Sequence, residues 1–484
     1  MPTTSASAAR IGWNFDNSYA RLPAVFHTRV APTPVAQPRL VLLNQPFARV
    51  LGLDPDAFAH PDAAALFTGN QLPPGAEPLA QAYAGHQYGH LARLGDGRAI
   101  LLGEHLTPAG ARFDIQLKGP GPTPYSRSGD GRAALGPMLR EYLISEAMQA
   151  LGIPTTRSLA VATTGESVFR EQPLPGAVLT RVAASHIRVG TFEYFAALGD
   201  TAALRLLADH TLRRHFPESA ESEQPVVALL VETIERQAAL IAQWMRVGFV
   251  HGVMNTDNMA LSGETIDYGP CAFIDIYDPA AVFSSIDRHG RYAFGQQPAI
   301  AAWNLARLAE ALLPILHSDP ETALALAEEA IDSFHQRFRR HWLAALRGKL
   351  GLFTDEPDDA TLAEDFLALL HQTRADYTRT FRQLHPTTAP SDPALAAWHQ
   401  RWTARLTRQP QPATEVTHRM HAHNPAVIPR NHAVEAALTA ATAHDLAPLQ
   451  SLLPALANPY AEPGHSRLDS PPAGTPRCRT FCGT

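Results

Sequence analysis

A short polar stretch of the chain carries three side chains suited to metal-assisted chemistry. Asp257 and Asn258 follow His251 by six and seven residues, and Asp267 comes nine residues after Asn258, beyond a turn at 262–263. Carboxylate and amide oxygens are the ligands that a hard cation such as Mg²⁺ takes, so Asn258 and Asp267 are candidate ligands of one metal ion. Asp257, directly beside them, is a candidate general base.

The same residue types also cap turns, and Asn255, Asp257 and Asn258 could do no more than that. Their order along the chain favours chemistry, because a long apolar helical pattern precedes them and a buried strand pattern follows. The order resembles the catalytic and magnesium loops of protein-kinase-like enzymes, with one departure. In small-molecule kinases of that type an Asp follows His-Gly, whereas this chain has Val253. The base would therefore be Asp257.

Lysine is rare in this chain and its two positions differ in setting. Of 40 lysines and arginines only Lys118 and Lys349 are lysines, a skew that a GC-rich coding bias largely explains. Lys118 ends an alternating pattern that places it on one strand face with Asp114 and Gln116. A compact ammonium fits beside phosphate where a guanidinium fork does not. Lys349 follows a helical run and is predicted to lie at the surface.

Lys118 needs an anion to hold it, and Glu141 is the first candidate. Glu141 lies in a helix predicted from Pro137 to Leu151. Kinase-like folds use such a pair of strand Lys and helix Glu to aim the ammonium at phosphate. The alternative is a solvated surface pair of Arg140 with Glu141.

Two glycine-rich turns and two arginines are further candidates for nucleotide binding. Glycine lets backbone amides approach phosphate, and arginine grips phosphate oxygens with two donors. The alternatives are an ordinary hairpin turn, a mobile connection and an ion pair between lobes. The candidates are Gly95, Gly97, Arg98, Asp130, Gly131, Arg181 and Arg188.

Strand and helix patterns separate along the chain, which predicts an α+β fold with a small sheet-rich N-terminal lobe and a large helical C-terminal lobe. The chain is expected to divide into four regions: an extension packing on the lobes, a nucleotide-binding lobe, a helical lobe with the catalytic and metal loops, and a mobile tail. Their bounds are 1–80, 81–190, 191–457 and 458–484. Strands are expected at 40–43, 98–104, 113–118, 159–162, 177–181 and 272–276. Helices are expected at 201–215, 226–247, 299–316, 320–347, 360–384 and 432–443.

Composition excludes several classes of protein. The net charge of −6 without a basic patch argues against nucleic-acid binding. No apolar run reaches about 20 residues, and the first residues lack the apolar core of a secretion signal, so neither a membrane nor export is expected. Three cysteines, Cys271, Cys478 and Cys482, make no disulfide framework and favour a reducing cytoplasm. His86 and His90 lack a third ligand for zinc.

Together these pieces resemble the SelO (YdiU) family, protein adenylyltransferases with a protein-kinase-like fold. The resemblance covers nearly the whole chain and is densest between 83 and 300. The motifs that carry it lie at 83–89, 95–98, 116–119, 129–132, 140–146, 180–182, Arg188, 251–258, 267–269, 424–425 and 430–431.

The resemblance implies that ATP binds inverted relative to kinases, so that AMP passes to a Ser, Thr or Tyr hydroxyl of a protein. Mg²⁺, with Mn²⁺ as an alternative, would be held by Asn258 and Asp267, and Asp257 would be the base. Glu141 would hold Lys118 in place. The residues that would contact the nucleotide are Gly95, Gly97, Arg98, Lys118, Asp130, Gly131, Arg181, Arg188 and Asp267. The alternatives are a protein or small-molecule kinase, a manganese-dependent UMP transferase, or a nucleotide-binding pseudokinase scaffold.

Members of the family often end in a redox-active Cys or selenocysteine motif. This chain ends in Cys482-Gly483-Thr484 and has Cys478 just before. Cys271 lies four residues after Asp267. We therefore state the hypothesis that oxidation joins Cys271 to a tail cysteine. Three unrelated thiols are the alternative, since cytoplasmic thiols normally stay reduced.

Overall fold

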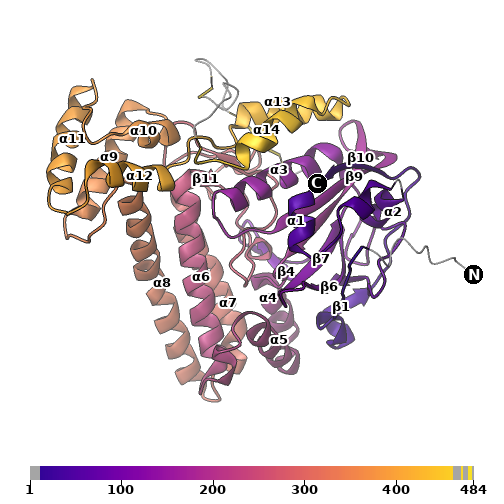
Figure 1. The fold of residues 1–484 in the computed structure, drawn as a ribbon. Helices are drawn as coiled ribbons and strands as arrows, with labels where there is room; N and C mark the ends of the chain where they lie inside the picture. The colour runs from indigo at the N-terminus through magenta and orange to yellow at the C-terminus, as the bar shows by residue number, and fades with distance from the viewer. Residues whose placement is uncertain (1–10, 61, 462–469, 472–477, 482–484) are drawn as a thin grey trace, which may run out of the picture.

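The computed structural model describes residues 11–60, 62–461, 470–471 and 478–481. The N-terminal part of the chain forms an antiparallel sheet, and the C-terminal part is helical (Figure 1). This mixed arrangement, with the sheet first and the helices after it, is the one the sequence predicts.

The main sheet has the strand order β1-β3-β6-β7-β10-β9-β2, with β8 paired to β10. Two further antiparallel pairs, β4–β5 and β11–β12, stand apart from it. The β4–β5 hairpin is inserted between β3 and β6. The strands are β1 (His27–Arg29), β2 (Arg39–Leu43), β3 (Leu79–Gln81), β4 (Ala84–Gln87), β5 (His90–Arg93), β6 (Ala99–Leu106), β7 (Arg112–Lys118), β8 (Ala133–Ala134), β9 (Arg157–Phe169), β10 (Pro173–Ala183), β11 (Phe249–Val250) and β12 (Ala272–Phe273).

Alternation along β7 separates the two faces of the sheet. Ile115 and Leu117 are buried in a core shared with Phe47 of α1 (Gln45–Val50) and Phe67 of α2 (Ala63–Thr68). The opposite face carries the polar residues of β7 and is covered by α3 (Leu135–Ala150), which packs on β9 and β10. The polar face of β7 therefore looks toward the helical part.

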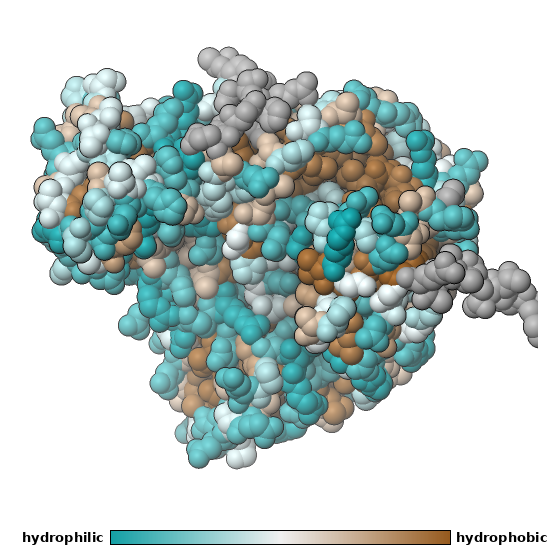
Figure 2. Space-filling view, in the orientation of Figure 1, coloured by the Kyte–Doolittle hydropathy of each residue, from teal (hydrophilic) through white to brown (hydrophobic). Residues whose placement is uncertain are grey.

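The helical part is built around long helices that pack side by side, α6, α7 and α8 (Figure 1). Its helices are α4 (Val189–Leu198), α5 (Thr201–His215), α6 (Pro225–Val247), α7 (Gln297–Leu316), α8 (Pro320–Lys349), α9 (Asp359–Thr373), α10 (Tyr377–Gln383), α11 (Pro393–Leu406), α12 (Ala413–His423), α13 (Asn431–Thr442) and α14 (Ala447–Leu456). Figure 2 shows mainly hydrophilic residues over the lower helices and apolar residues gathered toward the sheet side.

Within the described residues one span, Phe294–Leu316, is long and apolar enough to cross a membrane by length and composition alone. Of its most apolar window, 56% is buried inside the protein. The helix in this span, α7, packs against α4, α6 and α8. This helix is therefore part of the packed helical core.

Three sequence predictions are wrong in detail. The strand expected at 272–276 is limited to Ala272–Phe273. The helix expected at 360–384 is broken, because Arg374 adopts a left-handed conformation at φ 52° and Asp376 caps the new helix α10 by accepting from the Arg379 amide. Lys349 is buried, not exposed. Its Nζ donates to the Arg246 carbonyl at 3.0 Å and lies 4.0 Å from the centre of the Phe381 ring.

Described parts of the C-terminal tail contact both the sheet-rich and the helical part. The Tyr460 hydroxyl donates to the Leu151 carbonyl, and the Thr480 hydroxyl donates to the Pro270 carbonyl at 2.7 Å. Thr480 also pairs with Ser284 in an isolated parallel bridge. The tail thus returns to a position three residues beyond Asp267.

Candidate active site

Lys118 and Arg181 extend from neighbouring strands toward one carboxylate of the helical part. The Lys118 ammonium donates to Asp267 Oδ1 at 2.5 Å, and the Arg181 guanidinium donates to the same oxygen at 2.7 Å. Both cations also reach Glu141 of α3, at 2.6 and 3.2 Å. The pairing of β7 with β10 brings these side chains together, since Arg181 lies opposite Gln116 in the register. The result is a buried cluster of two cations and two anions.

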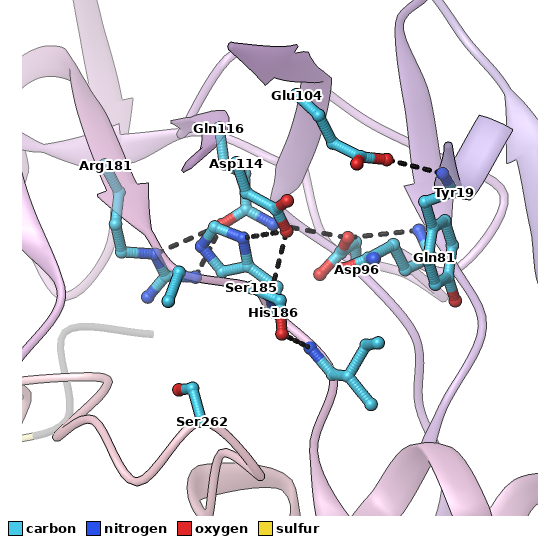
Figure 3. A network of polar contacts seen from close by, with 12 residues as sticks. Tyr19, Gln81, Asp96, Glu104, Asp114, Gln116, Arg181, Ser185, His186 and Ser262 are labelled. Atoms are coloured by element: carbon cyan, nitrogen blue, oxygen red, sulfur yellow. Dashed lines mark hydrogen bonds and ion pairs between the residues drawn. The ribbon is translucent and has the colours of Figure 1, made fainter. Parts of the chain in front are cut away.

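A second layer of polar contacts fixes the Arg181 guanidinium (Figure 3). Its Nε and NH2 both donate to Gln116 Oε1, at 3.1 and 2.6 Å. On the same face of β7, Asp114 accepts from the His186 amide at 2.9 Å and from Arg214 at 2.8 Å. Polar residues of β7 therefore order the arginine side chains at the junction of the two parts.

Asp267 is held in an unusual backbone conformation and in its ionised form. Its φ of 65° is left-handed, which is uncommon outside glycine and is associated with functional sites. Burial by itself would raise the pKa of Asp267, but the charges of Lys118 and two arginines hold that pKa well below its ordinary value. The Asp267 carboxylate is therefore ionised and able to bind a metal cation.

His251 joins the two loops that carry the candidate residues. Its Nδ1 accepts from the Val253 amide at 3.3 Å, so its Nε2 carries the proton and donates to the Ile266 carbonyl at 2.9 Å. The ring stacks on Trp244, and burial lowers the pKa of His251, which keeps it neutral. The role of His251 is to fix the chain just before Asp267.

Asp257 lies in a one-turn 3₁₀ helix, η6 (Thr256–Asn258), against the β4 strand. A Cβ placed on Gly85 would lie 2.3 Å from Asp257 Oδ1, so the carboxylate sits directly on the hairpin backbone. Burial raises the pKa of Asp257 to about 6, against the lowering effect of the Arg188 charge. Among the described residues its Oδ1 has no hydrogen-bond partner. Such a carboxylate can accept a proton near neutral pH.

Arg188 is buried at the start of α4 and faces three carboxylates. Burial by itself would lower the pKa of Arg188, but Tyr83 and the charges of Asp96, Asp267 and Asp257 raise it above its ordinary value. The guanidinium lies 4.3 Å from the centre of the Tyr83 ring. The ion pair with Asp96 is loose, at 4.0 Å. Neither Arg188 Nε nor Asp96 Oδ1 finds a hydrogen-bond partner within the described part of the chain. Buried polar atoms without partners, grouped beside Asp257, indicate a place where a polar ligand binds.

In the two glycine-rich turns the backbone packs directly against neighbouring residues and leaves no room for side chains. A Cβ on Gly95 would lie 2.4 Å from the Tyr125 ring, and one on Gly131 would lie 2.1 Å from the Gly121 carbonyl. The Ser126 hydroxyl donates to the Gly97 carbonyl, which ties the two glycine-rich loops together. Arg98 is half-buried, and its carbonyl accepts from the Gly119 amide at 2.8 Å, next to Lys118.

Asp130 stands apart from the buried cluster. It is exposed, pairs with Arg170 at 2.9 Å, and accepts from the Arg132 amide. The hydrogen bond from Arg170 is the largest influence that lowers the pKa of Asp130. The structure therefore gathers Lys118, Glu141, Arg181 and Asp267, with Arg188 and Asp257 beside them, and gives no contact between Asp130 and that group.

Comparison with known proteins gives the family. A family model described as "Protein adenylyltransferase SelO" matches residues 9–457. The chain belongs to this family. It is also 56% identical to a protein of Syntrophotalea carbinolica and 57% identical to one of Alkaliphilus metalliredigens, in each case over all of both chains. A protein of Geobacillus kaustophilus is 58% identical, over 98% of this chain and 99% of its own. All three relatives are named protein nucleotidyltransferase YdiU.

Membership in the SelO family implies a nucleotide substrate and a divalent metal, and the oxygen donors at the site fit such a metal. Asp267 is ionised, and the Asn258 amide uses its nitrogen to donate to the Val253 carbonyl at 2.9 Å, which leaves its oxygen for a metal. Among the described residues no group of three or more His, Cys, Asp or Glu side chains could hold a metal ion. Magnesium is commonly held by only one or two carboxylates, with phosphates and water completing its shell.

The cysteines of this SelO-family chain are poor nucleophiles where they are described. Burial raises the pKa of Cys271 to about 12 and that of Cys478 to about 11. Both are free thiols in the described structure. Cys482 lies outside the described residues. Oxidation between Cys271 and a tail cysteine stays a hypothesis, and the thiols would have to be exposed before a thiolate could form.

Sequence reasoning missed Asp96, Tyr83 and His86 as neighbours of the site. Asp96 stands between two of the glycines that the sequence singles out, which is a signal that could have identified it. Tyr83 and His86 lie in the sequence around a hairpin, and nothing local links them to residues more than 100 positions away. Only the folded structure shows that Tyr83 and His86 lie beside the site.

Proposed function

We propose that the chain transfers AMP from ATP to the hydroxyl of a Ser, Thr or Tyr residue in other proteins, with Mg²⁺ as the metal. The observation that carries the proposal is the buried group of Lys118, Arg181 and Asp267, in which two cations share one carboxylate oxygen. A nucleotide can take over these cations through its phosphates, while the released carboxylate turns to the metal. Membership in the SelO family supplies the choice of AMP transfer.

Each neighbouring residue has a part in this proposal. Lys118 and Arg181 bind phosphate oxygens, and Glu141 keeps the Lys118 ammonium in place. Arg188 offers its Nε, which has no hydrogen-bond partner among the described residues. Gly95, Gly97, Arg98, Asp130 and Gly131 are proposed to contact the nucleotide from the glycine-rich loops.

The transfer is a displacement at the α-phosphorus. The acceptor oxygen forms a bond to this phosphorus, the bond to the pyrophosphate oxygen breaks, and pyrophosphate leaves with the electron pair. Asp257 takes the proton of the acceptor hydroxyl. A bound divalent metal, for which Asn258 and Asp267 are the proposed ligands, would supply charge neutralisation for the phosphates. Positioning and electrostatic stabilisation, more than covalent help, lower the barrier of such reactions.

Further parts of the proposal rest on the family resemblance. The two parts of the chain correspond to the lobes of a protein-kinase-like fold, with the division at about 81–190 and 191–457. The antiparallel sheet, Lys118 on β7 and Glu141 on α3 support this assignment. We further propose a cytoplasmic location, supported by the low number of cysteines, since three are too few for a disulfide framework.

Transfer of radiolabel separates the proposed activity from its alternatives. The protein is incubated with ATP labelled at the α- or the γ-phosphate and a mixture of acceptor proteins. Protein-bound label from the α position supports AMP transfer, whereas label from the γ position identifies a kinase. Label from α-labelled UTP with Mn²⁺, exceeding that from ATP with Mg²⁺, identifies a UMP transferase. ATP binding without any label would overturn the proposal in favour of a scaffold.

A further inference from the structure

The β4–β5 hairpin is fastened to the loop that carries Asp257. Tyr88 and Gly89, with φ angles of 51° and 89°, form its two-residue turn. The His86 amide donates to the Thr256 hydroxyl at 2.7 Å, and the Tyr88 amide donates to Asn255 Oδ1 at 3.1 Å. The hairpin is covalently part of the sheet-rich part, since it lies between β3 and β6, yet its hydrogen bonds run to the helical part.

A carboxylate of α4 closes these contacts into a ring. Glu193 Oε1 lies 2.5 Å from His86 Nδ1, and Glu193 Oε2 accepts from the Thr256 hydroxyl at 2.5 Å. Thr256 in turn accepts from the His86 amide. The ring is closed to solvent at two of its corners, because Thr256 is fully buried and the Glu193 side chain is 5% exposed. One residue from each of three elements therefore meets at this point.

The loop around Asp257 has little local structure to hold it. The helix η6 has three residues, and its N-cap, Asn255, makes no side-chain capping bond. Instead the Asn255 side chain accepts from the Tyr292 hydroxyl at 2.6 Å and from the hairpin. A single 3₁₀ turn leaves most of its backbone groups without internal partners, so distant residues must fix it. The ring supplies such a constraint one residue before Asp257.

The ring also sets the surface against which the Asp257 carboxylate rests. Gly85, next to His86, leaves no room for a side chain beside Asp257 Oδ1. A Cβ on Gly190 would lie 1.9 Å from the Ala84 carbonyl, so the hairpin and the first turn of α4 are in direct backbone contact. A shift of the hairpin would therefore move the wall behind the base.

We propose that the ring of His86, Glu193 and Thr256 positions Asp257 for proton abstraction, so that these three are positioning residues of the transfer reaction. The inference rests on the proposed function. It assigns to the hairpin a task in the reaction: the hairpin holds the base at the distance that the acceptor hydroxyl requires. Misplacement of a catalytic group by about 1 Å can cost on the order of 10²-fold in rate.

Variants of Thr256 test the proposal, because they remove one hydroxyl and keep the volume of the side chain. In Thr256→Val, kcat is expected to fall about 10- to 100-fold with the KM for ATP changed less than about twofold. Thr256→Ser restores the hydroxyl and is expected to restore kcat. Glu193→Leu removes both acceptors of the ring from α4 and is expected to match Thr256→Val.

Thr211→Val is the matched control. Thr211 is a buried threonine of α5 whose hydroxyl bonds only within its own helix, to Leu207. The Thr211→Val variant loses a similar buried hydrogen bond that is not part of the ring, so its kcat should stay at the wild-type value. A kcat in Thr256→Val equal to that of Thr211→Val would overturn the proposal.

Amide hydrogen exchange provides a readout that does not depend on transfer. In Thr256→Val the amides of residues 84–88 and 255–258 are expected to exchange faster than in wild type and in Thr211→Val, at a temperature well below the Tm of each variant. If wild type labels no protein, the proposed function fails, and exchange alone then decides whether the ring fixes the loop. Unchanged protection in Thr256→Val would show that it does not.

Discussion

Lys118 and Asp267 are 149 positions apart in sequence and form an ion pair of 2.5 Å between the sheet-rich and the helical parts. The pair is buried on the Lys118 side, at 7% exposure, and more open on the Asp267 side, at 24%. A charged ligand can therefore approach from the side of the carboxylate. The pair stabilises the junction, and its exchange for phosphate and metal is the central event of the proposed binding step.

Lys118→Arg, although it keeps the charge, is expected to lower turnover by about 10²-fold or more. A planar guanidinium cannot occupy the space in which an ammonium contacts Glu141 and Asp267 together. Steady-state labelling with α-labelled ATP measures the effect. Arg401→Lys, at an exposed pair with Asp365, is the control for the reverse exchange and should have no effect. Full turnover in Lys118→Arg would make the lysine structural.

Asp257→Asn is expected to abolish AMP transfer and to leave ATP affinity within about twofold of wild type. The amide has the shape of the carboxylate but cannot accept the proton of the acceptor. Equilibrium binding of a non-hydrolysable ATP analogue is measured beside transfer. Residual transfer near the wild-type level would mean that another group is the base.

The pH dependence of transfer follows from the same carboxylate. Since the pKa of Asp257 is raised to about 6, the base is unprotonated above this pH and becomes protonated below it. The rate should thus be level near pH 7.5 and fall by about tenfold per unit once pH drops below 6. Asp96 has a similar pKa, about 6, but Asp96→Asn should retain the acid limb because that group takes no proton from the acceptor. A rate that stays level down to pH 5 contradicts the assignment.

Gly85→Ala adds one methyl group directly against Asp257 Oδ1, at 2.3 Å. Its φ lies outside the left-handed range, so the alanine itself is not strained and the carboxylate must move. We expect a fall in kcat of about 10- to 100-fold, together with a lower Tm because the added methyl overpacks a buried site. Gly136→Ala is the control, since a Cβ there meets only the Thr442 methyl at 3.6 Å. Equal kcat in the two variants would show that Asp257 tolerates displacement.

Asp267→Asn removes the anion shared by Lys118 and Arg181. Two buried cations then lose a partner, and the free energy of unfolding should drop by about 3 kcal/mol. ATP without metal should restore much of the lost Tm, because its phosphates replace the carboxylate, whereas metal should no longer enhance ATP binding. Asp130→Asn, at the exposed pair with Arg170, should change stability by less than about 1 kcal/mol. Equal Tm values for the two variants would contradict the charge balance described here.

Elements with strong periodicity were predictable from sequence, and the long-range contacts were not. The α5 helix has the predicted bounds, and β7 carries Lys118, Gln116 and Asp114 on one face as its alternation indicates. The strand expected at 272–276 is only Ala272–Phe273, because its partner strand β11 has just two residues. Local pattern cannot encode the length of a distant partner.

At the site, the candidate residues could be identified from their chemical types, whereas the contacts between them could be found only from the fold. Glu141 was the first candidate partner of Lys118, by analogy with kinase-like folds, and the structure forms this pair. The burial of Lys349 escaped notice because its neighbours, Arg246 and Phe381, come from other helices. In the same way His86 carried no local sign of its bonds to Glu193 and Thr256. Each of these contacts depends on tertiary packing that overrides local pattern.

The placement of the β4–β5 hairpin has a consequence for motion. The hairpin leaves the sheet after Gln81 and returns to it before Ala99, and its ends are held together by the bond from the Leu94 amide to the Tyr83 carbonyl. Any swing of the sheet away from the helices must therefore bend the two connecting segments, one of which contains Gly95 at φ 92°, or detach the hairpin from Thr256. A change in the angle between the sheet and the helices would therefore also act on the loop that carries Asp257.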